Sequence, residues 1–219
     1  MSIGYNLAHL VAAAVVLAAV IGWLRWPRLD RGGRWLVGGV TVSAAFLPLM
    51  LALLLAGRSN RLVHEFEMLL ETVAMVIAFG WWQPDSRRQQ RAWWLLGLFL
   101  VLWVGAQAIQ GLDSDFSYVS APIAGLVKVG AAGYTLVGRV QAARGRWTDN
   151  LWFWAAVGIM VIYGTGVILD PVWFQVFRAR DDLVVTAFVI YVAGNVLGYL
   201  LIARGLWRLP RVGVAPDAV

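Results

Sequence analysis

Apolar stretches long enough to cross a lipid bilayer recur along the whole chain, and they constrain the fold more than any other feature. Hydrophobic residues make up 61% of the 219 residues, and only 14% are charged. Lipid offers no partner to exposed backbone groups, and the alternating pattern of barrel strands is absent, so the stretches predict helices. We predict one all-α domain, 1–219, a bundle of seven transmembrane helices at about 5–25, 34–56, 62–82, 92–110, 117–138, 150–170 and 183–206.

The connections between these stretches are short, which leaves no room for a soluble domain. The first stretch lacks a positively charged segment before it, so we expect a retained helix and not a cleaved signal. The chain has no cysteine, which excludes disulfides, thiolate metal sites and cysteine nucleophiles. No nucleophile motif of a soluble enzyme is present, and we expect no enzymatic activity.

Arginine is distributed unevenly between the two ends of the predicted bundle. Thirteen arginines follow the first, third, fifth and seventh stretches, against four that follow the second and sixth. The positive-inside rule therefore predicts an N-terminus outside and a C-terminus in the cytoplasm, in a multi-pass protein of the plasma (inner) membrane. This topology accounts for the net charge of +6, so no nucleic-acid partner is needed to explain it. The lipid bilayer is the partner that we expect.

The only lysine of the chain, Lys128, lies near the middle of the fifth stretch. An ionisable side chain at the centre of a membrane is costly and marks a functional-site hypothesis. Glu71 lies near the middle of the third stretch, at a similar depth. We therefore predict that Lys128 pairs with Glu71, either as a structural ion pair or as part of a functional site.

Glu71 belongs to a polar stripe on the third helix. His64, Glu67 and Glu71 are spaced i, i+3, i+7, so they share one face and descend from the outer end towards the middle. Such a stripe is typical of a proton path or of a counterion complex. Glu65 points about 100° away from His64, and it is a further candidate for this path. For both Glu65 and His64, a solvated outer helix end is the alternative interpretation.

The sixth and seventh helices contribute Tyr163 and the pair Tyr191 and Asn195, which share a face at i, i+4. These residues are candidates for lining a binding site, or for bridging helices by hydrogen bonds. His9 and His64 offer too few ligands for a metal, and we expect no metal site.

Several stretches share the pattern of one family. The segment 33–57 looks like that family's second helix, 162–169 is similar to its sixth, and 189–204 resembles its seventh. The order of a basic residue, a carboxylate three on and a polar residue four further matches His64, Glu67 and Glu71. In these respects the chain resembles the microbial (type 1) rhodopsins, which implies a seven-helix fold and a retinal cofactor.

The resemblance breaks in the seventh helix. Asn195 stands where the family has its retinal-bearing lysine, and Tyr191 stands where it has an aspartate. Lys128 falls in a region of the fifth helix that lines the retinal pocket in the family. The resemblance thus implies either retinal attached to Lys128, with Glu71 or Glu67 as counterion, or a fold that has lost its chromophore.

Three functions follow from these patterns. The first is a retinal-binding photoreceptor or light-driven ion mover that uses Lys128. The second is a retinal-free sensor or scaffold with the rhodopsin fold, in which Lys128 and Glu71 form a structural pair and a homo-oligomer or a signalling partner is expected. The third is a small proton-coupled transporter, in which the stripe of His64, Glu67 and Glu71 carries protons.

Overall fold

The computed structural model describes residues 2–111, 119–142, 146–176 and 181–209. These residues form seven α-helices and two short 3-10 turns, which confirms the all-α prediction. The helices are α1 (Ser2–Leu24), α2 (Arg31–Leu55), α3 (Arg61–Trp81), α4 (Ser86–Gln110), α5 (Ser120–Ala142), α6 (Leu151–Val176) and α7 (Asp181–Trp207). The turns are η1 (Trp26–Arg28) and η2 (Trp147–Asp149).

The predicted helix positions agree with the structure to within four residues except at two ends: α6 ends at Val176, six residues after the expected end, and α4 begins early. This helix begins at Ser86, six residues before the expected start, because Asp85 caps it: its carboxylate accepts a hydrogen bond from the Arg88 amide at 2.8 Å. At the other end, Gly111 adopts a φ of 70°, which terminates the helix. The predicted start of the fifth helix, residues 117 and 118, lies outside the described residues.

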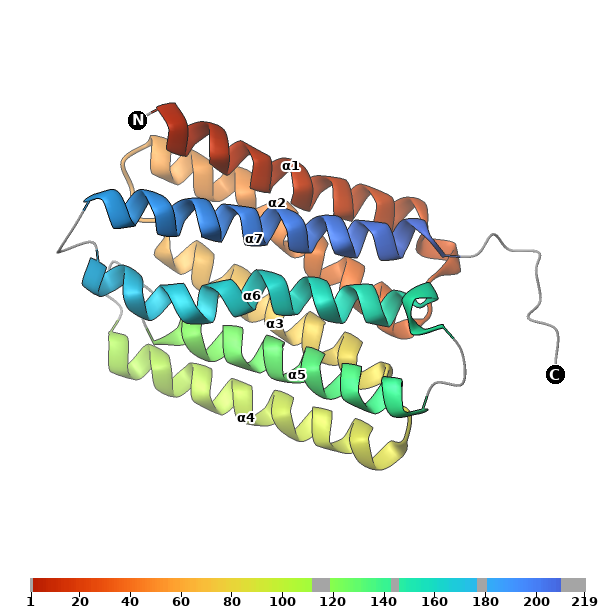
Figure 1. The fold of residues 1–219 in the computed structure, drawn as a ribbon. Coiled ribbons are helices and arrows are strands. Elements are labelled where there is room, and N and C mark those ends of the chain that lie inside the picture. Colours follow the sequence, from red (N-terminus) through yellow and green to blue (C-terminus); the bar gives the residue numbers. More distant parts are fainter. Residues whose placement is uncertain (1, 112–118, 143–145, 177–180, 210–219) are drawn as a thin grey trace.

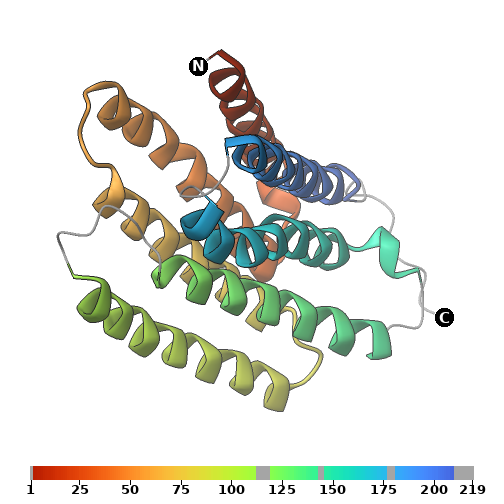
Figure 2. The same ribbon diagram turned by 60° about the vertical axis from the view of Figure 1, so that its left-hand side comes forward.

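Six of the helices close into a ring in the order α1, α2, α3, α5, α6, α7, as Figures 1 and 2 show. α3 contacts α5 directly, so α4 packs on the outside against these two helices. The buried residues of α4, Ala92, Phe99, Ala106 and Gln110, form a narrow seam along one side. Leu95, Leu96 and Trp103 are partly buried beside this seam. The exposed apolar side chains of α4 include Trp94, Leu98, Val101, Val104 and Ile109, as expected for a helix that faces lipid.

Within the described part of the chain, five helices are long and apolar enough to cross a membrane: 31–53, 86–110, 120–142, 151–169 and 185–207. The composition of the bundle is therefore that of a helical membrane protein. α3 is of similar length, but it carries three glutamates, all of which are buried inside the bundle. The part of α1 with described side chains, 9–24, is a shorter apolar helix.

The two ends of the bundle differ in polarity. We call the end where α1 begins and α2 connects to α3 the N-terminal end, and the opposite end, where α1 connects to α2, the arginine-rich end (Figure 1). Between the middle and the arginine-rich end, the ring is filled by side chains without any exposed surface. This apolar layer consists of Val40, Met75, Phe79, Ile159 and Ile202.

α6 and α7 approach each other through glycines. A Cβ atom at Gly158 would lie 2.6 Å from the backbone oxygen of Gly198, and the reverse substitution meets the same distance. Such glycines let two helix backbones come into contact, which is a common means of helix association in membranes. This contact fixes the position of α7 against α6.

Candidate functional site

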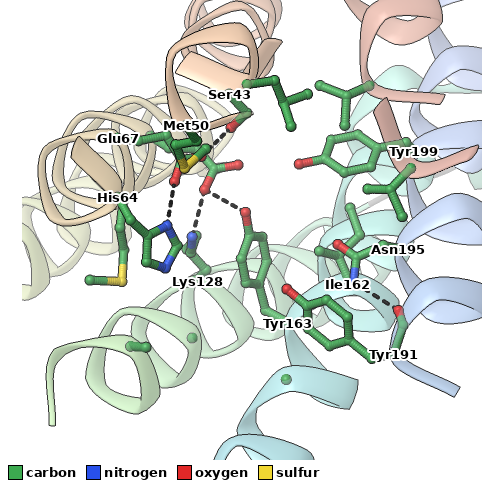
Figure 3. Close-up of a pocket in the computed structure, with 18 of the residues that line it drawn as sticks. Ser43, Met50, His64, Glu67, Lys128, Ile162, Tyr163, Tyr191, Asn195 and Tyr199 are labelled. Carbon is green, nitrogen blue, oxygen red and sulfur yellow. Dashed lines mark hydrogen bonds and ion pairs between the residues drawn. The ribbon is translucent and has the colours of Figure 1, made fainter. Parts of the chain in front are cut away.

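A cavity of about 270 Å³ lies inside the ring, in the half of the bundle towards the N-terminal end (Figure 3). α1, α2, α3, α5, α6 and α7 line it, whereas α4 does not. Its polar lining residues are Ser43, His64, Glu67, Glu71, Lys128, Tyr163, Tyr191, Asn195 and Tyr199. The cavity therefore brings together seven of the eight site residues expected from the sequence, and the eighth, Glu65, lies elsewhere.

Lys128 and Glu71 form the predicted ion pair at the inner limit of the cavity. The ammonium nitrogen of Lys128 lies 2.7 Å from Oε2 of Glu71, and the two residues are 1% and 2% exposed. The hydroxyl of Tyr163 donates a hydrogen bond to the same carboxylate oxygen. The Lys128 nitrogen also lies 3.4 Å from the centroid of the Tyr163 ring, within the range of a cation–π interaction. These contacts join α3, α5 and α6 at mid-depth.

The second carboxylate, Glu67, lies one turn closer to the N-terminal end. Its Oε2 is 3.3 Å from Nδ1 of His64, and its Oε1 accepts a hydrogen bond from the Ser43 hydroxyl at 2.9 Å. The His64 side chain is 44% exposed, whereas that of Glu67 is 10% exposed. The stripe on α3 therefore descends from a half-exposed histidine to the buried Glu71, as its spacing predicts.

The opposite wall of the cavity is formed by α7. The amide nitrogen of Asn195 donates to the backbone oxygen of Tyr191 at 2.8 Å, and its amide oxygen remains on the cavity side (Figure 3). Tyr199 lies one turn further along, with its hydroxyl directed into the cavity towards the acidic wall (Figure 3). Sequence reasoning missed Tyr199, although its spacing of four from Asn195 was a signal for it.

Glu65 corrects two expectations from the sequence. It is only 2% exposed, so it is not a solvated helix end, and it does not line the cavity. Its rotation away from His64 turns it towards α4 and α5, which supply three donors. These are Gln107 at 2.6 Å, Gln110 at 2.9 Å and Ser120 at 2.6 Å. Glu65 therefore belongs to a separate polar cluster that joins α3, α4 and α5.

No cluster of three or more His, Cys, Asp or Glu residues that could hold a metal occurs in the described part of the chain. The arrangement can instead offer a ligand two carboxylates, an amine, an amide and three phenol groups around one cavity. Comparisons with protein families, with curated proteins and with solved structures give no match to this chain.

Proposed function

We propose that this chain is a seven-span protein of the plasma (inner) membrane that binds a small molecule in its central cavity and acts as a receptor-type sensor. The observation that carries the proposal is a cavity with buried polar groups on one side of the bundle's middle and a sealed apolar layer on the other. Ligand sites in proteins are typically concave, with a few convergent polar groups on a mainly apolar wall.

Seven spans are supported by the dimensions of the helices. Each has between 21 and 27 residues, which corresponds to about 30 to 40 Å and suffices for a bilayer core. α3 can span despite Glu65, Glu67 and Glu71, because all three face protein groups and not lipid.

The proposed orientation places the arginine-rich end in the cytoplasm. Arginines at this end stack on aromatic rings: Arg25 on Trp207, Arg31 on Trp81, Arg34 on Trp26 and Arg204 on Trp154, at 4.5 to 5.9 Å from the ring centroids. Arginine and tryptophan together are typical of a membrane interface, and the excess of arginine favours the cytoplasmic side. Of the arginines counted for this rule, Arg144, Arg178, Arg180 and Arg211 lie outside the described residues.

The apolar layer favours a receptor over a transporter. A proton carried across the membrane needs ionisable groups or water along its whole route. On α3, the polar residues that line the cavity end at Glu71, and beyond it Met75 and Phe79 have no exposed surface. The buried polar side chains next to Phe79, Gln83 and Thr135, carry no charge and bond to each other and to its backbone oxygen. The proposed ligand therefore enters and leaves from the N-terminal end.

Retinal is a second candidate ligand, favoured by one observation. The Lys128 amine lines the cavity beside a carboxylate, which is the arrangement that a covalently attached aldehyde requires. Bound retinal would supply absorption of visible light. Purified protein incubated with all-trans retinal should then show a visible band that Lys128→Met abolishes; a preparation that stays colourless would exclude this candidate.

The proposed one-sided cavity can be tested directly, because the natural chain contains no cysteine. Single cysteines at Asn195 and at Ala203 form a matched pair on α7, since the two residues are 6% and 4% exposed. Asn195 lines the cavity, whereas Ala203 lies at the depth of the apolar layer. We expect a small, charged, membrane-impermeant thiol reagent added from outside to modify Asn195→Cys and to spare Ala203→Cys. Modification of both from both sides would indicate a conduit instead of a receptor.

A further inference from the structure

We infer that the cavity is built for a hydrophobic organic monocation, that is, for a small apolar molecule with a protonated amine. This inference rests on the proposed function and names the ligand class of the same site. Four features of the cavity carry it: its charge, an acceptor without a donor, its aromatic wall and its apolar remainder.

The cavity wall carries more carboxylates than permanently charged amines. Glu67 and Glu71 contribute two carboxylates, and Lys128 contributes one ammonium group. Lys128 is bonded to Glu71, so it is committed to one of the two. Among the described residues, Glu67 is bonded to His64 and Ser43, and a histidine is charged only when protonated. Glu67 therefore has no permanently charged partner among the described residues, and a monocationic ligand would supply one.

The inner carboxylate also lacks a donor. Oε2 of Glu71 receives both Lys128 and Tyr163, whereas Oε1 is buried and has no hydrogen-bond partner among the described residues. Buried polar atoms without partners are rare in native proteins and call for an explanation. Glu71 is in the cavity wall, and the amide oxygen of Asn195 lies on the facing helix. An ammonium group has the donors to serve both oxygens.

Tyrosines surround the position between these acceptors. Tyr163, Tyr191 and Tyr199 line the cavity from α6 and α7, and Figure 3 shows all three hydroxyls on the cavity side. Aromatic rings attract cations through their faces, and cages of such rings bind organic ammonium groups. The Tyr163 ring already holds the Lys128 ammonium at 3.4 Å. The ring of Tyr199, on the facing helix, offers a further aromatic group to the cation of a ligand.

The rest of the wall suits an apolar body. Val11, Val15, Leu47, Ile162 and Val167 line the cavity from α1, α2 and α6. Its volume of about 270 Å³ is at the lower end of the usual range for ligand pockets, which fits a molecule with a single ring and a short chain. The ammonium group would lie at the acidic wall and the ring among these aliphatic side chains.

The test compares three probes of the same shape: phenethylamine, phenethyl alcohol and hydrocinnamate, which are cationic, neutral and anionic. Binding to the full-length protein in lipid nanodiscs is measured by titration calorimetry. We expect phenethylamine to bind at least about tenfold more tightly than the other two, because a unit charge a few Å from a carboxylate is worth more than that factor in a partly buried site.

Two glutamate variants separate the cavity from the helix that carries it. Glu67→Gln removes a carboxylate from the cavity, and Glu65→Gln removes another buried carboxylate from the same helix outside the cavity. We expect Glu67→Gln to weaken phenethylamine binding about tenfold and Glu65→Gln to leave it within about twofold. Tyr199→Leu gives a second test that changes no charge, and it should weaken the amine more than the alcohol.

Each possible result has a different consequence for the inference and for the proposed function. Tighter binding of the amine with selective loss in Glu67→Gln supports the inference. Equal binding of the alcohol and the amine overturns the choice of a cation and leaves the proposed ligand cavity standing. Absence of binding by all three probes overturns the inference as well, and the labelling of Asn195→Cys from outside then decides whether the proposed function falls with it.

Discussion

Replacing either Lys128 or Glu71 alone should lower the free energy of unfolding far more than replacing both together. The two side chains are both 2% exposed, and their charged atoms are 2.7 Å apart. In Lys128→Met, the Tyr163 hydroxyl is the donor that the Glu71 carboxylate keeps among the described residues. In Glu71→Gln, the Lys128 ammonium keeps a neutral amide oxygen and the face of the Tyr163 ring. Each variant leaves one charge buried without its counterion.

The size of the effect follows from this geometry. Removing one partner of a buried ion pair costs about 3 to 5 kcal/mol, whereas replacing both by uncharged groups is often close to neutral. We expect a loss of about 3 kcal/mol for each single variant and about 1 kcal/mol for the double variant Glu71→Gln/Lys128→Met. The coupling energy of the double-mutant cycle, the loss in the double variant minus the two single losses, should therefore be about 5 kcal/mol in magnitude.

The free energy of unfolding can be measured by titrating the protein in mixed micelles with sodium dodecyl sulfate and following helix content. Gly164→Ala serves as a neutral control, because a Cβ atom there meets no other atom within 4 Å. Additive losses in the double variant would refute the reasoning, since they would mean that neither charge depends on the other. So would single variants that unfold like the natural protein.

Three further predictions address the topology, the α6–α7 contact and the Glu65 cluster. Cysteines at the exposed Ser59 and Asp149 should be modified by an impermeant thiol reagent from outside and from the cytoplasm, respectively; the reverse result would invert the orientation. Gly158→Ala should lower the free energy of unfolding by about 1 to 3 kcal/mol, because its Cβ atom would lie 2.6 Å from a backbone oxygen of α7, whereas Gly164→Ala should not lower it. Glu65→Gln should cost about 2 kcal/mol in the same unfolding assay, because it replaces a charged acceptor of three hydrogen bonds; a loss below 0.5 kcal/mol, about the usual limit for surface changes, would contradict this role.

The helices could be predicted from the sequence because their apolar runs are long and separated by polar connections. The early start of α4 could not, since it depends on the cap that Asp85 provides within a charged segment. The pairing of Lys128 with Glu71 was predictable from depth alone. Two opposite charges near the middle of a membrane have few other partners, and the chain has only one lysine.

The sequence did not allow us to predict which helix packs against a given face of another helix. The position of Glu65 depends on α4, which lies outside the ring and brings Gln107 and Gln110 to that face of α3. Ser43 and Tyr199 line the cavity because α2 and α7, which carry them, close the ring on either side of α1. Spacing along one helix gives a shared face, whereas the partner of that face is set by the packing of the whole bundle.

The central claim is that the cavity is a ligand site open to one side of the membrane. Its most direct measurement is the rate at which an impermeant thiol reagent modifies Asn195→Cys, added first to intact spheroplasts and then to inside-out vesicles. We predict modification from the outside at a rate at least tenfold above that from the cytoplasmic side, and slower modification when phenethylamine is present at saturation. Equal rates from the two sides, or faster modification from the cytoplasm, would contradict the claim.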